Sequence, residues 1–320
     1  MDIFLYILSR NIVPIFLMIA AGFILAKKFT IDVYSLSKLN FYIFIPAFMF
    51  VNLFTANLDW AMMQVVVFGI VILIAYDLVG LVIAKIRNFE PGLTNAFKTT
   101  IMFNNCGNIG ISLITLIFSG DPYIVDGKTP YLDTALAALI MTLLLQIIVT
   151  NTLGFFYAGR AKFNTKELLI NIFSMPTIYV APLVIILKLI GFDMKQTTIW
   201  PALESLSYGL VPMALVTLGV QLSHTQFSLK DSAVHLAVFA RLIIGPVLAI
   251  ACIYFFGFYG IIAQAIFIAY AAPTAVNVAL IAVECDNFPD FSAQTVMAST
   301  IFSAITLTFA IYIARVIYPI

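Results

Sequence analysis

The chain has 320 residues, of which 63% are hydrophobic and only 10% are charged, and its formal net charge is +1 at pH 7. This balance excludes a soluble globular domain of such length and indicates a polytopic membrane protein. A net charge so close to zero gives no sign of a nucleic-acid partner.

Apolar runs long enough to cross a bilayer recur from one end of the chain to the other. They predict an all-α polytopic membrane protein with ten transmembrane helices, at residues 5–26, 37–55, 62–84, 95–118, 131–157, 168–191, 199–221, 232–255, 259–283 and 293–317. No basic segment precedes the first run, so we expect it to remain as a helix and not to be cleaved as a signal peptide.

Lysine and arginine are distributed unevenly between the two sets of loops. Ten fall on one side: Lys27, Lys28, Lys38, Lys85, Arg87, Lys98, Arg160, Lys162, Lys166 and Lys230. Five fall on the other: Arg10, Lys128, Lys188, Lys195 and Arg315. Cytoplasmic loops are enriched in these residues. We therefore expect a multi-pass protein of the cell membrane with both termini extracytoplasmic.

Asp77 is an acidic residue deep inside the third predicted helix. A carboxylate in the bilayer is paired, protonated or exposed to a wet path. Two interpretations stay open. Asp77 is either a proton or conformational switch, or a structural hydrogen-bond acceptor at the helix end nearer Lys85.

Polar residues interrupt the middle of the fourth predicted helix, where Asn104, Asn105 and Asn108 lie with Gly107 and Gly110. Glycine weakens a helix, and amides at this depth are costly unless they face a cavity or a partner. We predict a broken helix whose amides bind substrate, and whose second half directs its partly positive N-terminus to the same place. Amide packing between helices is the alternative.

The fifth and eighth helices each carry polar residues in apolar runs. Gln146 and Asn151 are five residues apart, so we expect one to line a cavity and the other to pack. Arg241 could attract an anionic substrate, pair with a carboxylate such as Asp77 or Glu204, or extend to the membrane interface. Of these, structural pairing is favoured.

The ninth predicted helix contains a second helix breaker, Pro273, followed by Thr274 and Asn277. Proline removes one backbone hydrogen bond and exposes a carbonyl. We predict that these three residues complete the substrate site.

The chain also has the signs of an internal duplication. Placing Pro46 in register with Pro212 gives an offset of 166 residues, which also brings Gly107 onto Pro273. Five helices per copy is an odd number, so the second copy must be inverted in the membrane. The predicted repeats are residues 1–160 and 161–320, an arrangement typical of secondary transporters.

The motifs at residues 104–110 and 272–277 resemble those of the auxin efflux carrier family, which includes plant auxin exporters and bacterial malate and malonate permeases. The resemblance covers nearly the whole chain. It implies a fold similar to bile-acid symporters and sodium/proton antiporters, with broken helices 4 and 9 crossing in an X. It further implies a scaffold of helices 1, 2, 6 and 7, a core of helices 3–5 and 8–10, and a homodimer.

The resemblance also bears on individual residues. In the plant carriers an acidic residue of helix 3 and a glutamine of helix 5 support the substrate site, and Asp77 and Gln146 are similar in placement. The plant carriers have proline at both crossings, whereas helix 4 here has Cys106 and Gly107. That difference argues against a plant-like substrate.

We therefore predict a secondary transporter that moves malate, malonate or a similar small carboxylate by alternating access, without a cofactor or metal. An exporter of auxin-like aromatic acids and a channel-like facilitator are the alternatives. The sequence lacks a phosphate-binding lysine loop, a metalloprotease histidine pair and a nucleophile elbow, which argues against an enzyme.

Overall fold

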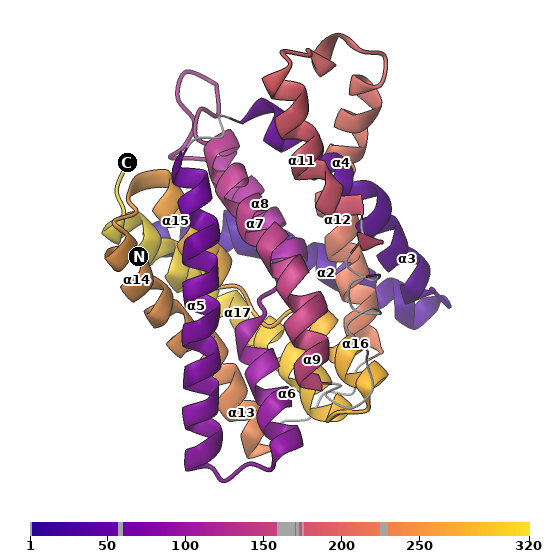
Figure 1. Ribbon diagram of the computed structural model, residues 1–320, viewed down its shortest axis with the longest axis vertical. Helices are drawn as coiled ribbons and strands as arrows, with labels where there is room; N and C mark the ends of the chain where they lie inside the picture. The colour runs from indigo at the N-terminus through magenta and orange to yellow at the C-terminus, as the bar shows by residue number, and fades with distance from the viewer. Residues whose placement is uncertain (1, 57–59, 159–169, 171–172, 175, 225–229) are drawn as a thin grey trace.

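The computed structural model describes the chain except for residues 1, 57–59, 159–169, 171–172, 175 and 225–229 (Figure 1). The described part is helical and contains no strand. Among the described residues, seven helical stretches are long and apolar enough to cross a membrane: Phe4–Lys28, Val33–Thr55, Trp60–Ile86, Leu132–Ala158, Trp200–Ser223, Ser232–Phe256 and Pro289–Ile317. Shorter apolar helices lie between them. The chain is thus a multi-pass membrane protein.

The first three stretches follow the predicted helices closely. They consist of α1 (Asp2–Ile7), η1 (Leu8–Ile12) and α2 (Val13–Lys28), then α3 (Val33–Leu39), η2 (Asn40–Phe44) and α4 (Ile45–Thr55), then α5 (Trp60–Ile86). The second begins four residues before the predicted start because the carboxylate of Asp32 accepts the N–H groups of Tyr34 and Ser35 and caps α3.

The following elements include the predicted breaks. They are α6 (Pro91–Met102), η3 (Cys106–Gly110) and α7 (Ile111–Phe118), then α8 (Leu132–Val149), η4 (Thr150–Gly154) and α9 (Phe155–Ala158), then α11 (Pro176–Leu189) and η5 (Met194–Gln196). The sixth predicted helix, 168–191, is seen only from Pro176 in regular helix, and its beginning lies largely outside the described residues. The lysines and arginine of residues 160–166 lie outside them too.

The last elements complete the chain. They are α12 (Trp200–Ser223), then α13 (Ser232–Phe239), η6 (Ala240–Ile244) and α14 (Gly245–Phe256), then α15 (Gly260–Tyr270) and α16 (Val276–Cys285), and finally α17 (Pro289–Ile317). The η elements other than η5 are π-helical turns; η3 begins the helix Cys106–Phe118, and the others lie inside longer helices. Such turns shift the helical face by one residue and are frequent at functional sites.

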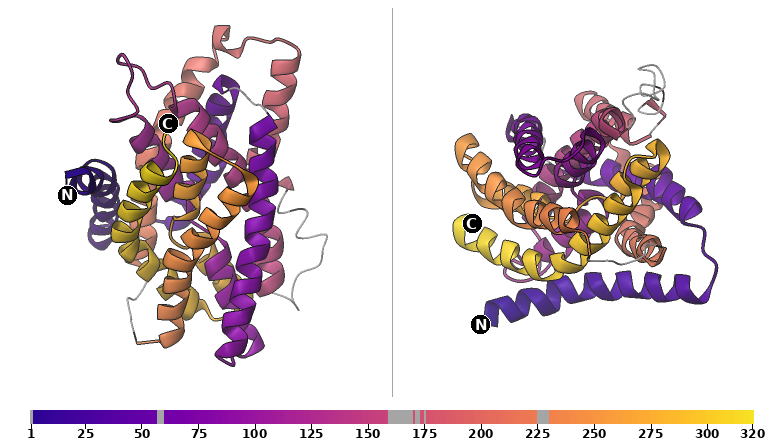
Figure 2. Two further views of the ribbon diagram at one scale, coloured as in Figure 1. Left: turned by 90° about the vertical axis from the view of Figure 1, so that its left-hand side faces the viewer. Right: turned by 90° about the horizontal axis from the view of Figure 1, so that it is seen from below.

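One group of helices packs around α12, which runs along α2 and α4, while α11 also contacts α4. The α1–α2 helix lies along the outside of the bundle (Figure 2). A Cβ atom at Gly219 would lie 1.9 Å from the Ile19 carbonyl oxygen, and one at Gly22 would lie 2.1 Å from that of Val216. Glycine therefore allows α2 and α12 to touch through their backbones, as small residues do between membrane helices.

A second group packs around the two breaks. Helix α8 contacts α5 on one side and α15 on the other, and α17 contacts α13, α15 and α16. In Figure 1, α5 and α8 run side by side along the long axis, with α6 and α7 next to them. The breaks after α6 and α15 lie at the centre of this group, where Phe103 and Ala272 have no exposed surface.

Candidate functional site

Two broken helices meet at the centre of the molecule. Helix α6 ends at Met102 and η3 begins at Cys106, while α15 ends at Tyr270 and α16 begins at Val276. The residues between run antiparallel, with Asn104 bridged to Thr274. The Asn105 N–H donates to the Pro273 oxygen over 2.7 Å, and the Ala275 N–H donates to the Phe103 oxygen over 2.9 Å. Each break thus satisfies backbone groups of the other, as a non-helical segment inside a membrane requires.

Arg241, from the π-turn η6, binds the C-terminal ends of both broken helices. Its guanidinium donates to the carbonyl oxygen of Ile101 over 2.7 Å, to that of Ala272 over 3.1 Å, and to that of Tyr270. The side chain is fully buried and stacks on the Tyr76 ring. This geometry fits the predicted structural role of Arg241, but the groups that it binds are not the predicted carboxylates. Arg241 binds neither Asp77 nor Glu204, because the partly negative ends of α6 and α15 supply its counter-charge.

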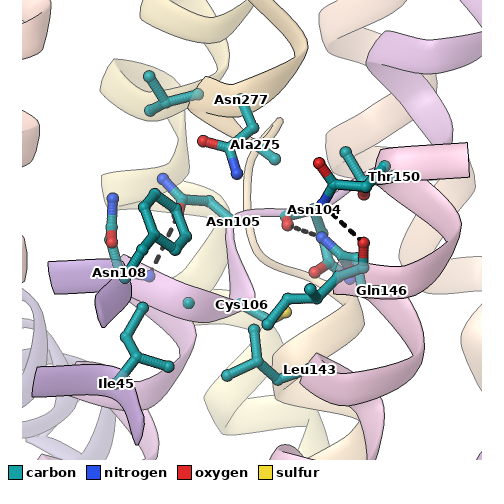
Figure 3. Close-up of a pocket in the computed structure, with 15 residues that line it drawn as sticks. Ile45, Asn104, Asn105, Cys106, Asn108, Leu143, Gln146, Thr150, Ala275 and Asn277 are labelled. Atoms are coloured by element: carbon teal, nitrogen blue, oxygen red, sulfur yellow. Dashed lines mark hydrogen bonds between the residues drawn. The ribbon is translucent and has the colours of Figure 1, made fainter. Parts of the chain in front are cut away.

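A cavity lies on the other side of the crossing, next to the N-terminal ends of both second half-helices (Figure 3). We call it the central cavity. Its lining combines carboxamides with apolar side chains: Phe41, Ile45, Asn104, Asn105, Cys106, Gly107, Asn108, Leu143, Gln146, Ile147, Thr150, Asn151, Ala275, Val276 and Asn277. Among these described residues none carries a charge. The predicted residues Asn104, Asn105, Gly107, Asn108, Gln146 and Asn277 therefore come together around one space.

The amides of Asn104 and Asn105 are almost entirely buried. Asn104 is 1% exposed, and within the described chain neither its side-chain oxygen nor its nitrogen has a hydrogen-bond partner. The Oδ1 of Asn105 accepts the Asn108 N–H over 3.3 Å and caps η3, whereas its Nδ2 has no partner there. Buried polar groups without partners are costly. Their presence in the wall of a cavity indicates a place where a ligand or water completes the bonding.

Gln146 and Asn151 both line the central cavity, so the expectation that only one of them would do so is wrong. Gln146 lies in the last turn of α8, and Asn151 lies in the π-turn η4 that follows it. The Gln146 amide also donates to the Asn104 backbone oxygen and so fixes the first break.

Pro273 and Thr274 do not line the central cavity. The Thr274 hydroxyl donates to the Thr100 oxygen over 2.9 Å, and its N–H donates to the Ser299 hydroxyl over 3.2 Å. The Pro273 oxygen is occupied by the Asn105 N–H. In this structure both residues hold the crossing together, and only Asn277 of the predicted trio reaches the cavity.

Asp77 lies outside the central cavity and forms an ion pair with Lys98, with 2.7 Å between Oδ1 and Nζ. Lys98 was assigned to a loop by charge counting, and this is wrong. It lies inside α6, is 7% exposed, and has its ammonium 4.0 Å from the centre of the Tyr157 ring. The sequence places Asp77 toward the helix end nearer Lys85, and its cationic partner, Lys98, comes from another helix. Asp77 borders an apolar groove between α5 and the helix that contains η4.

Several lining residues were not predicted. Phe41 comes from η2, about one turn before Pro46, and Ile45 begins α4 directly before Pro46. Thr150 begins the π-turn η4. Their apolar or small polar side chains give no signal in an apolar run. The described residues also hold no cluster of three histidine, cysteine or acidic side chains that could bind a metal ion.

Comparison with known proteins agrees with this architecture. Residues 7–311 match the family described as "Membrane transport protein". The chain is also 22% identical, over 306 residues, to a protein described as an uncharacterized transporter from Methanothermobacter thermautotrophicus, with 93% of this chain and 96% of the relative covered. The chain therefore belongs to the membrane transport protein family, the auxin efflux carrier-like family that its two motifs resemble, and is a membrane transporter.

Proposed function

We propose that the protein is a secondary carrier for a small organic anion, with malate, malonate or a similar carboxylate as substrate, and that the central cavity is its binding site. One observation carries the proposal. The N-terminal ends of two half-helices border the same cavity as the Asn104 amide and the Asn105 Nδ2, which have no hydrogen-bond partner among the described residues. Helix N-termini offer free N–H groups and a partial positive charge, and carboxamides donate hydrogen bonds to carboxylate oxygens.

We further propose that the chain works as two inverted five-helix repeats, residues 1–160 and 161–320. The antiparallel pairing of the two breaks supports this, because an inverted repeat brings equivalent segments together in opposite directions. Helices 1, 2, 6 and 7 would form the scaffold, and helices 3–5 and 8–10 the moving core. The contacts of α12 with α2 and α4 and of α8 with α5 and α15 agree with that division. Both termini would be extracytoplasmic, and the scaffold would form a homodimer.

The central cavity lies between the proposed scaffold and core, since Phe41 and Ile45 come from the scaffold and the remaining lining residues from the core. A substrate held there would be released to opposite sides of the membrane as the core rocks against the scaffold. We propose that Asp77 and Arg241 support the site indirectly, through the ion pair on α6 and the carbonyl bonds at the crossing.

A ligand-binding screen tests the proposal. The purified protein is heated with a panel of small mono- and dicarboxylates, with indole-3-acetate and a cationic and a neutral solute as comparison. A ligand that binds only the folded state raises the melting temperature as its concentration rises. We expect one carboxylate class to do so, and the shift to disappear in Asn105→Ala. Stabilisation by the cationic or neutral solute alone would contradict an anion carrier.

A further inference from the structure

We propose that the central cavity neutralises one negative charge, so that it binds a carboxylate as a monoanion and rejects a dianion. The inference rests on the proposed function and adds the charge state of the substrate to it. The reason is the balance of charge at the crossing, where four helix ends and the guanidinium of Arg241 meet.

The two C-terminal ends at the crossing are already neutralised. Each helix end carries roughly half an elementary charge, so the ends of α6 and α15 together amount to about one negative charge. The buried guanidinium of Arg241 supplies one positive charge to the carbonyl oxygens of Ile101, Tyr270 and Ala272. This half of the crossing is therefore close to neutral, and its arginine is not available to a substrate.

The two N-terminal ends have no such partner among the described residues. The helix Cys106–Phe118 and the helix α16 both begin at the wall of the central cavity, through Gly107 and Asn108 on one side and Val276 and Asn277 on the other. Their partial charges sum to roughly one positive charge. Within the described part of the chain, no acidic side chain lines the cavity to cancel this positive charge. A single carboxylate would complete the balance.

A second negative charge on the substrate would have no positive counter-charge in the described wall of the cavity. The remaining polar groups of the wall are the carboxamides and the Thr150 hydroxyl, which form hydrogen bonds but carry no net charge. An ionised group taken out of water without a counter-charge is strongly disfavoured. A second carboxyl group of the substrate therefore has to enter protonated, where an amide oxygen such as the unpartnered one of Asn104 accepts its hydrogen.

The consequence is a pH dependence that belongs to the substrate. Above the second pKa of a dicarboxylic acid, the monoanion fraction falls about tenfold per pH unit, and the apparent affinity falls with the competent fraction. The lining has one titratable side chain among the described residues, the Cys106 thiol. Other titratable or charged groups near the crossing stay behind its wall: Tyr76, Asp77, Lys98, Tyr157, Arg241 and Tyr270.

The experiment measures the dissociation constants of malonate and monomethyl malonate with the purified protein, from pH 5 to pH 8 in roughly one-unit steps. The monoester is a monoanion throughout this range. We expect its dissociation constant to stay constant, and that of malonate to rise about tenfold per pH unit once its second carboxyl group ionises. In Asp77→Asn the affinity itself changes if the Lys98 ion pair supports the site, but the slope of the malonate profile against pH should stay the same, because Asp77 does not line the cavity.

Three results would overturn the inference, and they differ from one another. Equal malonate affinity across the range would mean that the dianion binds, and would leave the carboxylate site itself standing. Parallel loss of malonate and monoester affinity would assign the pH dependence to a protein group, and its disappearance in Asp77→Asn would identify that group. Binding of neither ligand at any pH would refute the malonate-like substrate class together with its charge state.

Discussion

At the level of single residues, the side chain of Asn105 has two tasks that can be separated. Its Oδ1 caps η3 through the Asn108 N–H, while its Nδ2 remains unpartnered in the described chain at the wall of the cavity. Aspartate is an equally good N-cap, but it has no amide donor and adds a negative charge. The two atoms can therefore be tested by two substitutions.

We expect Asn105→Ala to destabilise the protein by about 1 kcal/mol through loss of the cap, and Asn105→Asp to leave stability nearly unchanged. Both variants should lose transport and carboxylate binding, the second through repulsion of the anion. Melting temperature and uptake into proteoliposomes measure the two effects. Asn52→Ala is the matched control, since Asn52 donates to the Phe48 oxygen within its own helix and does not line the cavity. Normal uptake by Asn105→Asp would remove this residue from the site.

Whether the sequence predicts the role of a single residue depends on whether its partner is a recognisable side chain or a backbone group. Amides in an apolar run are recognisable, and Asn104, Asn105, Asn108 and Asn277 do lie together. The partners of Arg241 are backbone carbonyl oxygens, which every residue has, so no residue type reveals them. Lys98 looks like a loop cation because only the folded chain brings Asp77 beside it.

At the level of elements, the ends of the helices at the two breaks matter more for the proposed site than the lengths of the helices do. Glycine, amides and proline mark the breaks after Met102 and Tyr270 in the sequence. The π-turns leave no comparable mark, because they add one residue to a turn without a special residue type. The five-residue spacing of Gln146 and Asn151 likewise did not reveal that both line the central cavity.

The role of Arg241 as the counter-charge of two helix ends leads to a stability prediction. Arg241→Met would leave three buried carbonyl groups and two partly negative helix ends without a partner, and loss of one side of a buried charged pair costs roughly 3–5 kcal/mol. We expect a large fall in melting temperature. The same substitution at the exposed Arg87 should change stability by less than about 0.5 kcal/mol. A folded Arg241→Met protein with wild-type stability and no anion binding would instead make Arg241 a substrate ligand.

The backbone contact between α2 and α12 gives a second prediction for elements. In Gly219→Ala the new methyl group would lie 1.9 Å from the Ile19 oxygen, so the two helices must separate. Overpacking of this kind costs about 1–3 kcal/mol or more. In Gly107→Ala the nearest atom, Leu143 Cδ1, would be 3.7 Å away, an ordinary contact. We expect thermal unfolding to show a much larger loss for Gly219→Ala, whereas equal losses would argue against close packing of these helices.

At the level of the whole molecule, the sequence predicts a helical multi-pass membrane protein, because a bilayer demands long apolar segments. The arrangement of those segments in space was less predictable from the sequence. Charge counting treats a lysine near the end of an apolar run as a loop residue. Lys98 was counted in this way, although it is buried in an ion pair with Asp77. The match to the membrane transport protein family over residues 7–311 rests on the chain as a whole and not on such single positions.

A carrier that binds one negative charge and needs no coupling ion would move that charge across the membrane with each substrate. One elementary charge is worth about 2.3 kcal/mol per 100 mV, which corresponds to an equilibrium accumulation of about 50-fold. We therefore expect proteoliposomes with an interior-positive potassium diffusion potential to accumulate labelled malonate at pH 5.5 in the absence of sodium and of a proton gradient. Reversal of the potential should cause exclusion, and protein-free vesicles give the background. Accumulation that ignores the potential would mean that a cation crosses with each anion. In that case a charge compensator other than the two helix ends must exist, and the Asp77–Lys98 pair is the first place to look for it.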